Sequence, residues 1–177
     1  VSAIRQFGHA APLHVRPGDP PLALGVASIA AALRAARVSH EVISVNVANV
    51  AEDGAPNFEA IAQRVLETNC TDAAISAFVW TEPYTQQLSR MLQPNVRVGL
   101  GGPQITYTGP PRGEQPESLE QLYPFADWFV RGPAEAPMLQ LGSGSAHARP
   151  RGVHFAGEFD MGLQAVSTFD QLPSPFP

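Results

Sequence analysis

The segment that most constrains the fold is residues 96–104, Val-Arg-Val-Gly-Leu-Gly-Gly-Pro-Gln, a short β-branched run that stops at two glycines and a proline. Such a run is typical of a buried parallel strand, because helices cover both faces of a parallel sheet. Gly101 and Gly102 lack a Cβ, so the backbone can turn sharply there or approach another group closely. Ligands of open α/β sheets bind beyond the carboxyl ends of strands. The glycine pair therefore indicates either a tight turn or a ligand site.

The rest of the chain alternates between strand-like and helix-like segments. Further strands are expected at residues 1–7, 40–47, 73–80 and 128–131, and helices at residues 22–37, 58–69, 119–122 and 135–141, with another helix that begins after Thr81 and contains Pro83 in its first turn. This alternation predicts an α/β fold with a doubly wound, mainly parallel five-stranded sheet. The expected strand order is 2-1-3-4-5, as in flavodoxin-like and Rossmann-like domains.

The chain is expected to form one α/β domain followed by an extension. Residues 1–142 contain all the alternating segments, whereas residues 143–177 are punctuated by serine, glycine and proline and are interpreted as an extension and linker. A strand pair is expected inside the extension, around residues 153–155 and 164–166.

Charge and composition exclude several classes of partner. The net charge is −5 and only 15% of residues are charged, so a small molecule is a better candidate partner than nucleic acid or a membrane surface. No apolar run reaches the roughly 18 residues of a membrane span and no signal-type segment is present, which favours a cytoplasmic location. The only cysteine, Cys70, excludes an internal disulfide and any iron–sulfur cluster held by several thiolates of this chain.

Irregular segments converge on one rim of the expected sheet. This rim carries residues 8–21, 76–82, 101–106 and 131–135, at the carboxyl ends of the first, third, fourth and fifth strands. A dinucleotide site would need Gly-x-Gly-x-x-Gly directly after the first strand, but here the pair of glycines at 99 and 101 lies on the fourth strand and the third glycine is missing. A Walker loop and the acidic cluster of a phosphorelay receiver are also missing from the sequence.

Five segments in order resemble a known family. They are Pro-Leu-Ala-Leu-Gly-Val at 21–26, Ser-Ala-Phe-Val-Trp at 76–80, Leu-Gly-Gly-Pro-Gln at 100–104, Asp-Trp-Phe-Val-Arg-Gly at 127–132 and Phe-Asp-Gln-Leu-Pro-Ser-Pro at 169–175. Together they resemble the N-terminal cobalamin-binding domain of cobalamin-dependent radical S-adenosylmethionine enzymes of the methylase type. The resemblance implies that residues 1–142 bind cobalamin and that residues 143–177 lead toward a radical barrel outside this chain.

The resemblance also implies an activity for the longer enzyme. S-adenosylmethionine and a [4Fe-4S] cluster on a Cys-x-x-x-Cys-x-x-Cys motif would lie in the barrel, and a methyl group would pass through methylcobalamin to an unactivated carbon of a small-molecule substrate, for example in natural-product biosynthesis. A rival interpretation is a stand-alone corrinoid carrier or sensor domain without catalysis of its own. A third is a structural α/β module that binds no ligand.

The corrin ring is expected across the strand ends, with its nucleotide tail beside the glycine pair. Gln104 and Thr106 are candidates to hydrogen-bond the amides and phosphate of the tail, and Ser76 is expected to face it. No catalytic residue and no protein ligand to the metal is expected. The residues expected to bind the cofactor are Pro21, Leu22, Leu24, Ser76, Trp80, Thr81, Gly101, Gly102, Pro103, Gln104, Thr106, Arg131, Gly132 and Glu135.

Two of these residues have alternative interpretations. The Asp-x-His-x-x-Gly motif of other cobalamin carriers is missing around His9 and His14, so Trp80 is the candidate to occupy the lower face of cobalt without coordinating it. Trp80 is equally consistent with a buried core residue at a strand end. Glu135 follows Pro133, where the family commonly has a first glutamate, and is either a cofactor contact or a favourable charge in the first turn of a helix.

Overall fold

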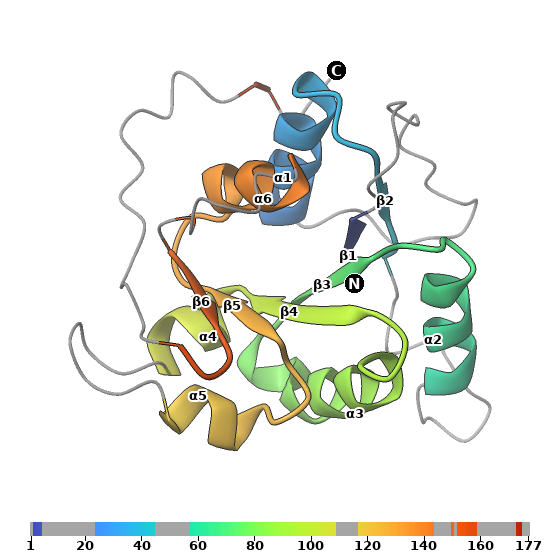
Figure 1. Ribbon diagram of the computed structural model, residues 1–177, viewed down its shortest axis with the longest axis vertical. Helices are drawn as coiled ribbons and strands as arrows, with labels where there is room; N and C mark the ends of the chain where they lie inside the picture. The colour runs from blue at the N-terminus through green and yellow to red at the C-terminus, as the bar shows by residue number, and fades with distance from the viewer. Residues whose placement is uncertain are drawn as a thin grey trace.

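The structure, a computed structural model, describes residues 2–4, 24–44, 57–108, 117–143, 150, 152–158 and 173–174 (Figure 1). The strands are β1 (Ser2–Ile4), β2 (His40–Val42), β3 (Asp72–Ser76), β4 (Arg97–Gly101), β5 (Trp128–Val130) and β6 (Val153–Phe155). The helices are α1 (Leu24–Ala35), α2 (Phe58–Leu66), α3 (Glu82–Leu92), α4 (Pro103–Thr108), α5 (Glu117–Leu122) and α6 (Glu135–Gly142), and a 3₁₀ turn, η2 (Val79–Thr81), precedes α3.

The described strands form one mixed sheet in the order β2-β1-β3-β4-β5-β6. β3, β4 and β5 are parallel neighbours, with Asp72 opposite Arg97 and Ser76 opposite Gly101. The α/β class is therefore confirmed, and the first five strands lie in the expected spatial order. The expected direction of the first strand is wrong, because β1 pairs antiparallel with both β2 and β3. α1 lies between β1 and β2 in the chain, yet the two strands are antiparallel neighbours, so the alternation of strand and helix does not fix the direction of β1.

The sixth strand comes from the segment interpreted as an extension. β6 confirms the strand expected at 153–155, but it pairs antiparallel with β5, opposite Val130 and Trp128. The other half of the expected strand pair, residues 164–166, lies outside the described residues. The extension therefore contributes an element to the sheet itself.

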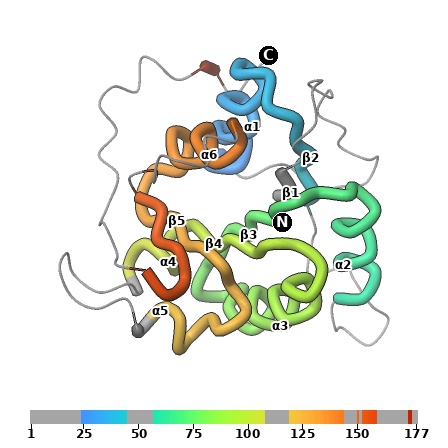
Figure 2. The backbone as a smooth tube through the Cα atoms, in the orientation of Figure 1, coloured from blue at the N-terminus to red at the C-terminus, as the bar shows by residue number. Residues whose placement is uncertain are grey.

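Helices cover the two faces of the sheet unequally. Figure 2 shows α1 and α6, which are far apart in sequence, side by side on one face. Their core is small and includes Leu33, Met138, Trp128 and Val130. On the opposite face α2, α3 and α5 pack over a larger core, to which Phe129 belongs. β5 supplies both cores because alternate side chains of a strand point to opposite faces.

Two local predictions differ from the structure. The strand expected at 73–80 ends at Ser76, because the Thr81 hydroxyl accepts a hydrogen bond from the Phe78 N–H at 2.9 Å and donates one to the Phe78 carbonyl at 3.1 Å, which turns the chain into η2. The loop expected after the glycine pair is the short helix α4, which starts at Pro103. A proline costs little at this position, since the first N–H groups of a helix have no partner within it.

Candidate functional site

A cavity of about 340 Å³ lies at the carboxyl ends of β3, β4 and β5. Its walls are the face of the sheet that carries α1 and α6, the two helices themselves, and the turns that follow the three strands. Because the three strands are parallel, their ends meet at one edge of the sheet, where open α/β sheets bind ligands. We call this space the rim cavity.

Small residues on the sheet make room for the rim cavity. Ala74 and Ser76 of β3 and Gly101 of β4 line it. A Cβ on Gly101 would meet only Val130, at 3.6 Å from its Cβ, and a Cβ on Gly25 of α1 would meet nothing within 4 Å. The cavity is therefore open where side chains are missing, so a flat group can approach the backbone closely.

The two glycines of the pair have different roles. Gly102 has a φ of +103°, and a Cβ there would come within 2.7 Å of the Ala77 carbonyl oxygen and 3.3 Å of the Ser76 hydroxyl. Gly102 thus makes a tight turn against the end of β3, whereas Gly101 opens the cavity. The tight-turn interpretation therefore holds for Gly102, whereas Gly101 lines the rim cavity.

The remaining lining is mostly apolar. Val26 and Ile29 of α1 face Met138 of α6 across the space, and Phe78 and Trp128 complete the wall. Apolar walls with few polar groups are typical of small-molecule sites, where the polar groups orient the ligand.

Glu135 is the exception in this lining. Among the described residues that line the rim cavity, Glu135 alone has an ionisable side chain. Its Oε1 accepts a hydrogen bond from the Ser28 hydroxyl at 2.8 Å. Glu135 also lies in the first turn of α6, where a negative charge is favourable. The hydrogen bond ties α6 to α1, so the carboxylate is held at the cavity in a defined orientation.

The structure brings half of the described candidate residues to the rim cavity. Those that line it are Ser76, Gly101, Gly102, Pro103, Gly132 and Glu135. Those that do not are Leu24, Trp80, Thr81, Gln104, Thr106 and Arg131. Pro21 and Leu22 lie outside the described residues, as do His9 and His14.

Gln104 lies on the α3 side of the turn, away from the cavity. Its amide donates to the Glu82 carboxylate at 3.4 Å, next to the buried phenol of Tyr123. Burial raises the pKa of Tyr123, and the negative charge of Glu82 acts in the same direction. The expected contact of Gln104 with a nucleotide tail is therefore not available in this arrangement.

Thr106 and Arg131 support the rim instead of lining it. The Thr106 hydroxyl donates to the Gly102 carbonyl at 3.0 Å and accepts from the Gly132 N–H at 3.0 Å, so it joins the turn after β4 to the turn after β5. Arg131 is buried, and its N–H donates to the Gly152 carbonyl at 3.0 Å. Both residues hold the strand ends at the spacing that the cavity requires.

Trp80 is not a core residue. Its side chain is 73% exposed and stacks on Phe78, with ring centroids 5.0 Å apart and planes 14° apart. Leu24 and Tyr107, on the segments that border the same rim, are also strongly exposed. Phe78 lines the rim cavity, so the stack places Trp80 next to the cavity wall.

Sequence reasoning missed most of the cavity wall. Val26 and Ile29 were expected only as part of the helix at residues 22–37, and Trp128 only as part of a strand. The position of Gly25 next to Val26 is the signal that could have indicated this wall, since a glycine within an otherwise continuous helix face leaves a gap in the packing.

No three His, Cys, Asp or Glu side chains gather to form a metal site in the part of the chain that the structure describes. Across the same residues, no helix combines the length and the apolar character needed to span a membrane. No protein-family model matches the sequence, and neither does any curated protein.

Proposed function

We propose that this chain is the cobalamin-binding domain of a cytoplasmic, cobalamin-dependent radical S-adenosylmethionine methyltransferase. The observation that carries the proposal is the rim cavity, which lies at the carboxyl ends of three neighbouring parallel strands and is open over Gly101. The resemblance of the glycine-pair segment and the four other segments to that family supports the same assignment.

The dimensions of the rim cavity suit the nucleotide tail better than the corrin ring. Its volume of about 340 Å³ is at the lower end of the range of roughly 300–1,000 Å³ for small-molecule pockets. This is room for a planar base with part of its sugar. The positions where Gly25 and Gly101 lack a Cβ are the places where such a base would lie closest to the backbone.

The corrin ring would then lie across the exposed rim. Leu24 and Tyr107 offer apolar surface there, and Trp80 stands beside the cavity mouth through its stack on Phe78. An indole has no basic lone pair for a metal, so Trp80 would cover the lower face of the ring without coordinating cobalt. Cobalamin, when bound, supplies the methyl-carrying metal centre.

In this proposal the residues of this chain bind and orient cobalamin. The apolar wall excludes water from the base, Ser76 and Glu135 hold polar groups of the tail, and Thr106 fixes the distance between the strand ends. S-adenosylmethionine, the [4Fe-4S] cluster and the small-molecule substrate would be bound by a further domain, because the single cysteine of this chain, Cys70, is buried and supplies one thiolate at most.

Titration with hydroxocobalamin tests the proposal. The chain should bind it, and Gly101→Val should weaken binding at least about tenfold, because the new side chain projects into the rim cavity. Gln87→Ala, on the exposed surface of α3, is the matched control and should bind like the parent. Gly102→Val is a poor test, since its Cβ would strike the Ala77 carbonyl whether or not a ligand is present. An unchanged affinity in Gly101→Val would place the ligand elsewhere.

Electron paramagnetic resonance tests the role of Trp80. The cob(II)alamin complex should show no nitrogen splitting from a protein histidine, and Trp80→Ala should perturb its signal. A nitrogen splitting that disappears in His9→Ala or His14→Ala would show that a histidine, not Trp80, occupies the lower face.

A further inference from the structure

The indole N–H of Trp128 is a buried hydrogen-bond donor that no other described residue satisfies. Trp128 is 1% exposed and lines the rim cavity, and its Nε1 has no hydrogen-bond partner among the described residues. Buried donors of this kind are rare in folded proteins, because an N–H removed from water normally finds an acceptor. The missing acceptor is a feature that a ligand in the cavity can provide.

The indole is held in one place by the sheet. It lies over Gly99 on the neighbouring strand β4, where a Cβ would overlap the ring, and Gly99 and Trp128 are paired in register. α1 and α6 cover its other side through Leu33 and Met138. The donor is therefore preorganised, so its alignment with a ligand costs little conformational entropy.

Glu135 provides a second polar position, nearer the mouth of the cavity. β5 runs from Trp128 toward the rim, and Glu135 follows beyond its end at the start of α6. A carboxylate accepts hydrogen bonds from hydroxyl or N–H groups and repels anions. Trp128 of β5, the Glu135 carboxylate and several apolar side chains thus line the same cavity.

We infer that the rim cavity selects corrinoids by the chemistry of their lower base. A neutral, planar nitrogen heteroaromatic base would enter with its free ring nitrogen accepting from the Trp128 N–H, and its sugar hydroxyls would donate to Glu135. This inference rests on the proposed function and adds the class of base that the site prefers: a benzimidazole, which carries the ring nitrogen, over a phenolic base, which has no ring nitrogen to accept the hydrogen bond.

A comparison of two corrinoids on three proteins tests the inference. The parent chain should bind cobalamin about tenfold more tightly than the corrinoid with a p-cresol base, the effect of one hydrogen bond to a buried donor. In Trp128→Phe this preference should fall to within about twofold, because the donor is removed for both ligands. The lost ring area lowers both affinities alike, so the ratio isolates the hydrogen bond. Gln87→Ala, on the exposed surface of α3, is the control and should keep the preference.

A second measurement does not depend on a core variant that can fail to fold. The sequence has two tryptophans, so Trp80→Phe leaves a single indole ¹⁵N–¹H signal, that of Trp128. Saturation with diamagnetic hydroxocobalamin should move its proton downfield and slow its exchange with water. An indole signal that keeps its position and exchange rate would overturn the inference.

The failure of the inference and the failure of the proposed function give different results. If hydroxocobalamin does not bind at all, the proposed function is wrong. If it binds no more tightly than cobinamide, which lacks the nucleotide tail, corrin binding stands but the tail does not enter the rim cavity. If the parent does not discriminate between the benzimidazole and phenolic corrinoids, or Trp128→Phe still does, Trp128 has only a packing role.

Discussion

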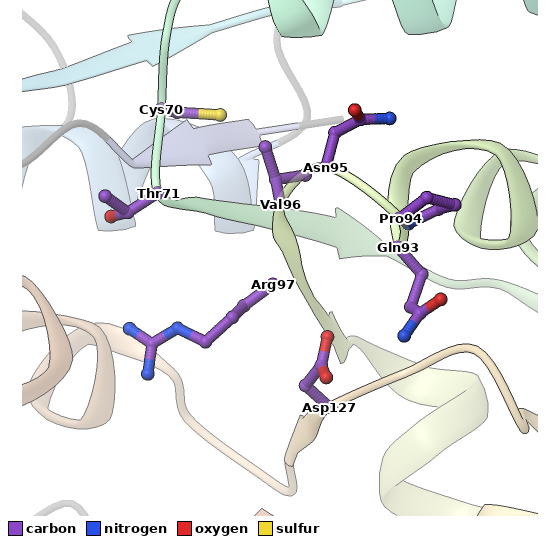
Figure 3. Close-up of a pocket in the computed structure, with 8 residues that line it drawn as sticks. All are labelled: Cys70, Thr71, Gln93, Pro94, Asn95, Val96, Arg97 and Asp127. Carbon is purple, nitrogen blue, oxygen red and sulfur yellow. The ribbon is translucent and has the colours of Figure 1, made fainter.

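The two ends of the central strands are built in opposite ways. At the carboxyl ends the rim cavity is mostly apolar, and the Trp128 donor that lines it has no partner among the described residues. At the amino ends of β3 and β4 lies a hollow of about 420 Å³ that is lined mostly by polar side chains (Figure 3). There Asp72 accepts from Arg97 and from Thr71, each at 2.8 Å, and Asp127 accepts from the Val98 N–H at 2.7 Å.

The polar groups at the two ends of the strands therefore differ in their partners. At the amino ends they bond within the protein, whereas the Trp128 N–H at the rim cavity has no partner among the described residues. Thr71 and Arg97 of the amino-end hollow donate to Asp72, and Asp127 accepts from the backbone, which fastens the starts of the strands together. His40, Ile4, Asp72 and Arg97 are successive partners across this end of the sheet. Changes at the amino end should therefore alter stability, and changes at the carboxyl end should alter binding.

Two glycines on the same face of β4 give the sharpest contrast. Gly99→Ala should destabilise the fold by about 3 kcal/mol, because the new methyl group overlaps the buried indole of Trp128. Gly101→Ala, two residues nearer the rim, should change the free energy of unfolding by less than about 0.5 kcal/mol, since its Cβ makes only ordinary van der Waals contacts. Urea unfolding measures both. Equal costs at the two positions would remove the distinction between a packed and an open half of the strand.

Asp127 is the next test, at the amino end. Asp127→Ala should lower the free energy of unfolding by about 2 kcal/mol, because the Val98 N–H, in a fully buried residue, loses its acceptor. Asp127→Asn keeps an acceptor oxygen and should cost clearly less. Hydroxocobalamin affinity should stay the same in both variants. A loss of affinity without a loss of stability would mean that the two ends are coupled.

The pH dependence of stability should also originate at the amino end. Burial lowers the pKa of His40 below its usual 6.5, and the charge of Arg34 acts in the same direction, while a hydrogen bond from Nδ1 to the Val38 carbonyl at 2.8 Å opposes the shift. Between the folded-state pKa and 6.5 the unfolded chain binds a proton that the folded chain does not. Stability should therefore fall as the pH drops below 6.5 and level off below the folded-state pKa. Unfolding free energies on either side of 6.5 should differ less in His40→Gln than in the parent.

The smallest effect is expected at Arg97. Its ion pair with Asp72 is short, but the guanidinium side is 59% exposed, so Arg97→Gln should cost less than about 1 kcal/mol and the cost should shrink in high salt. The unfolding free energy at low and high ionic strength checks this. A large, salt-independent cost would show that this pair is as important to the fold as Asp127.

The fold could be predicted wherever local pattern and packing agree. The apolar spacing of α1 has a helical period, whereas the uncharged run at 73–76 and the β-branched run before the glycine pair are short enough to indicate buried strands. The direction of β1 could not be predicted, because direction depends on which neighbours a short strand meets in space. α4 was missed because its six residues are too few to show a helical period.

The candidate site could be predicted to a similar degree. Ser76, Gly101 and Glu135 were found because strand ends and glycines mark the rim. Gln104 does not line the rim cavity and Trp80 is not a core residue, because short turns control which way their side chains point. A hydroxyl–backbone bond at Thr81 turns the chain before Trp80, and Glu82 binds Gln104 on the other face. Such contacts join residues whose pairing has no signature in the sequence.

The strand β6 also decides where this protein can be divided. It occupies one side of β5 and satisfies backbone groups that would otherwise face solvent, and the Arg131 N–H just beyond β5 relies on Gly152 in the same way. A chain cut after Gly142 would keep every other described strand and helix, yet it would expose an unprotected edge made of Trp128, Phe129 and Val130. Exposed apolar edges of this kind pair with one another and drive aggregation. A soluble fragment for binding experiments therefore has to extend through the turn that follows Phe155.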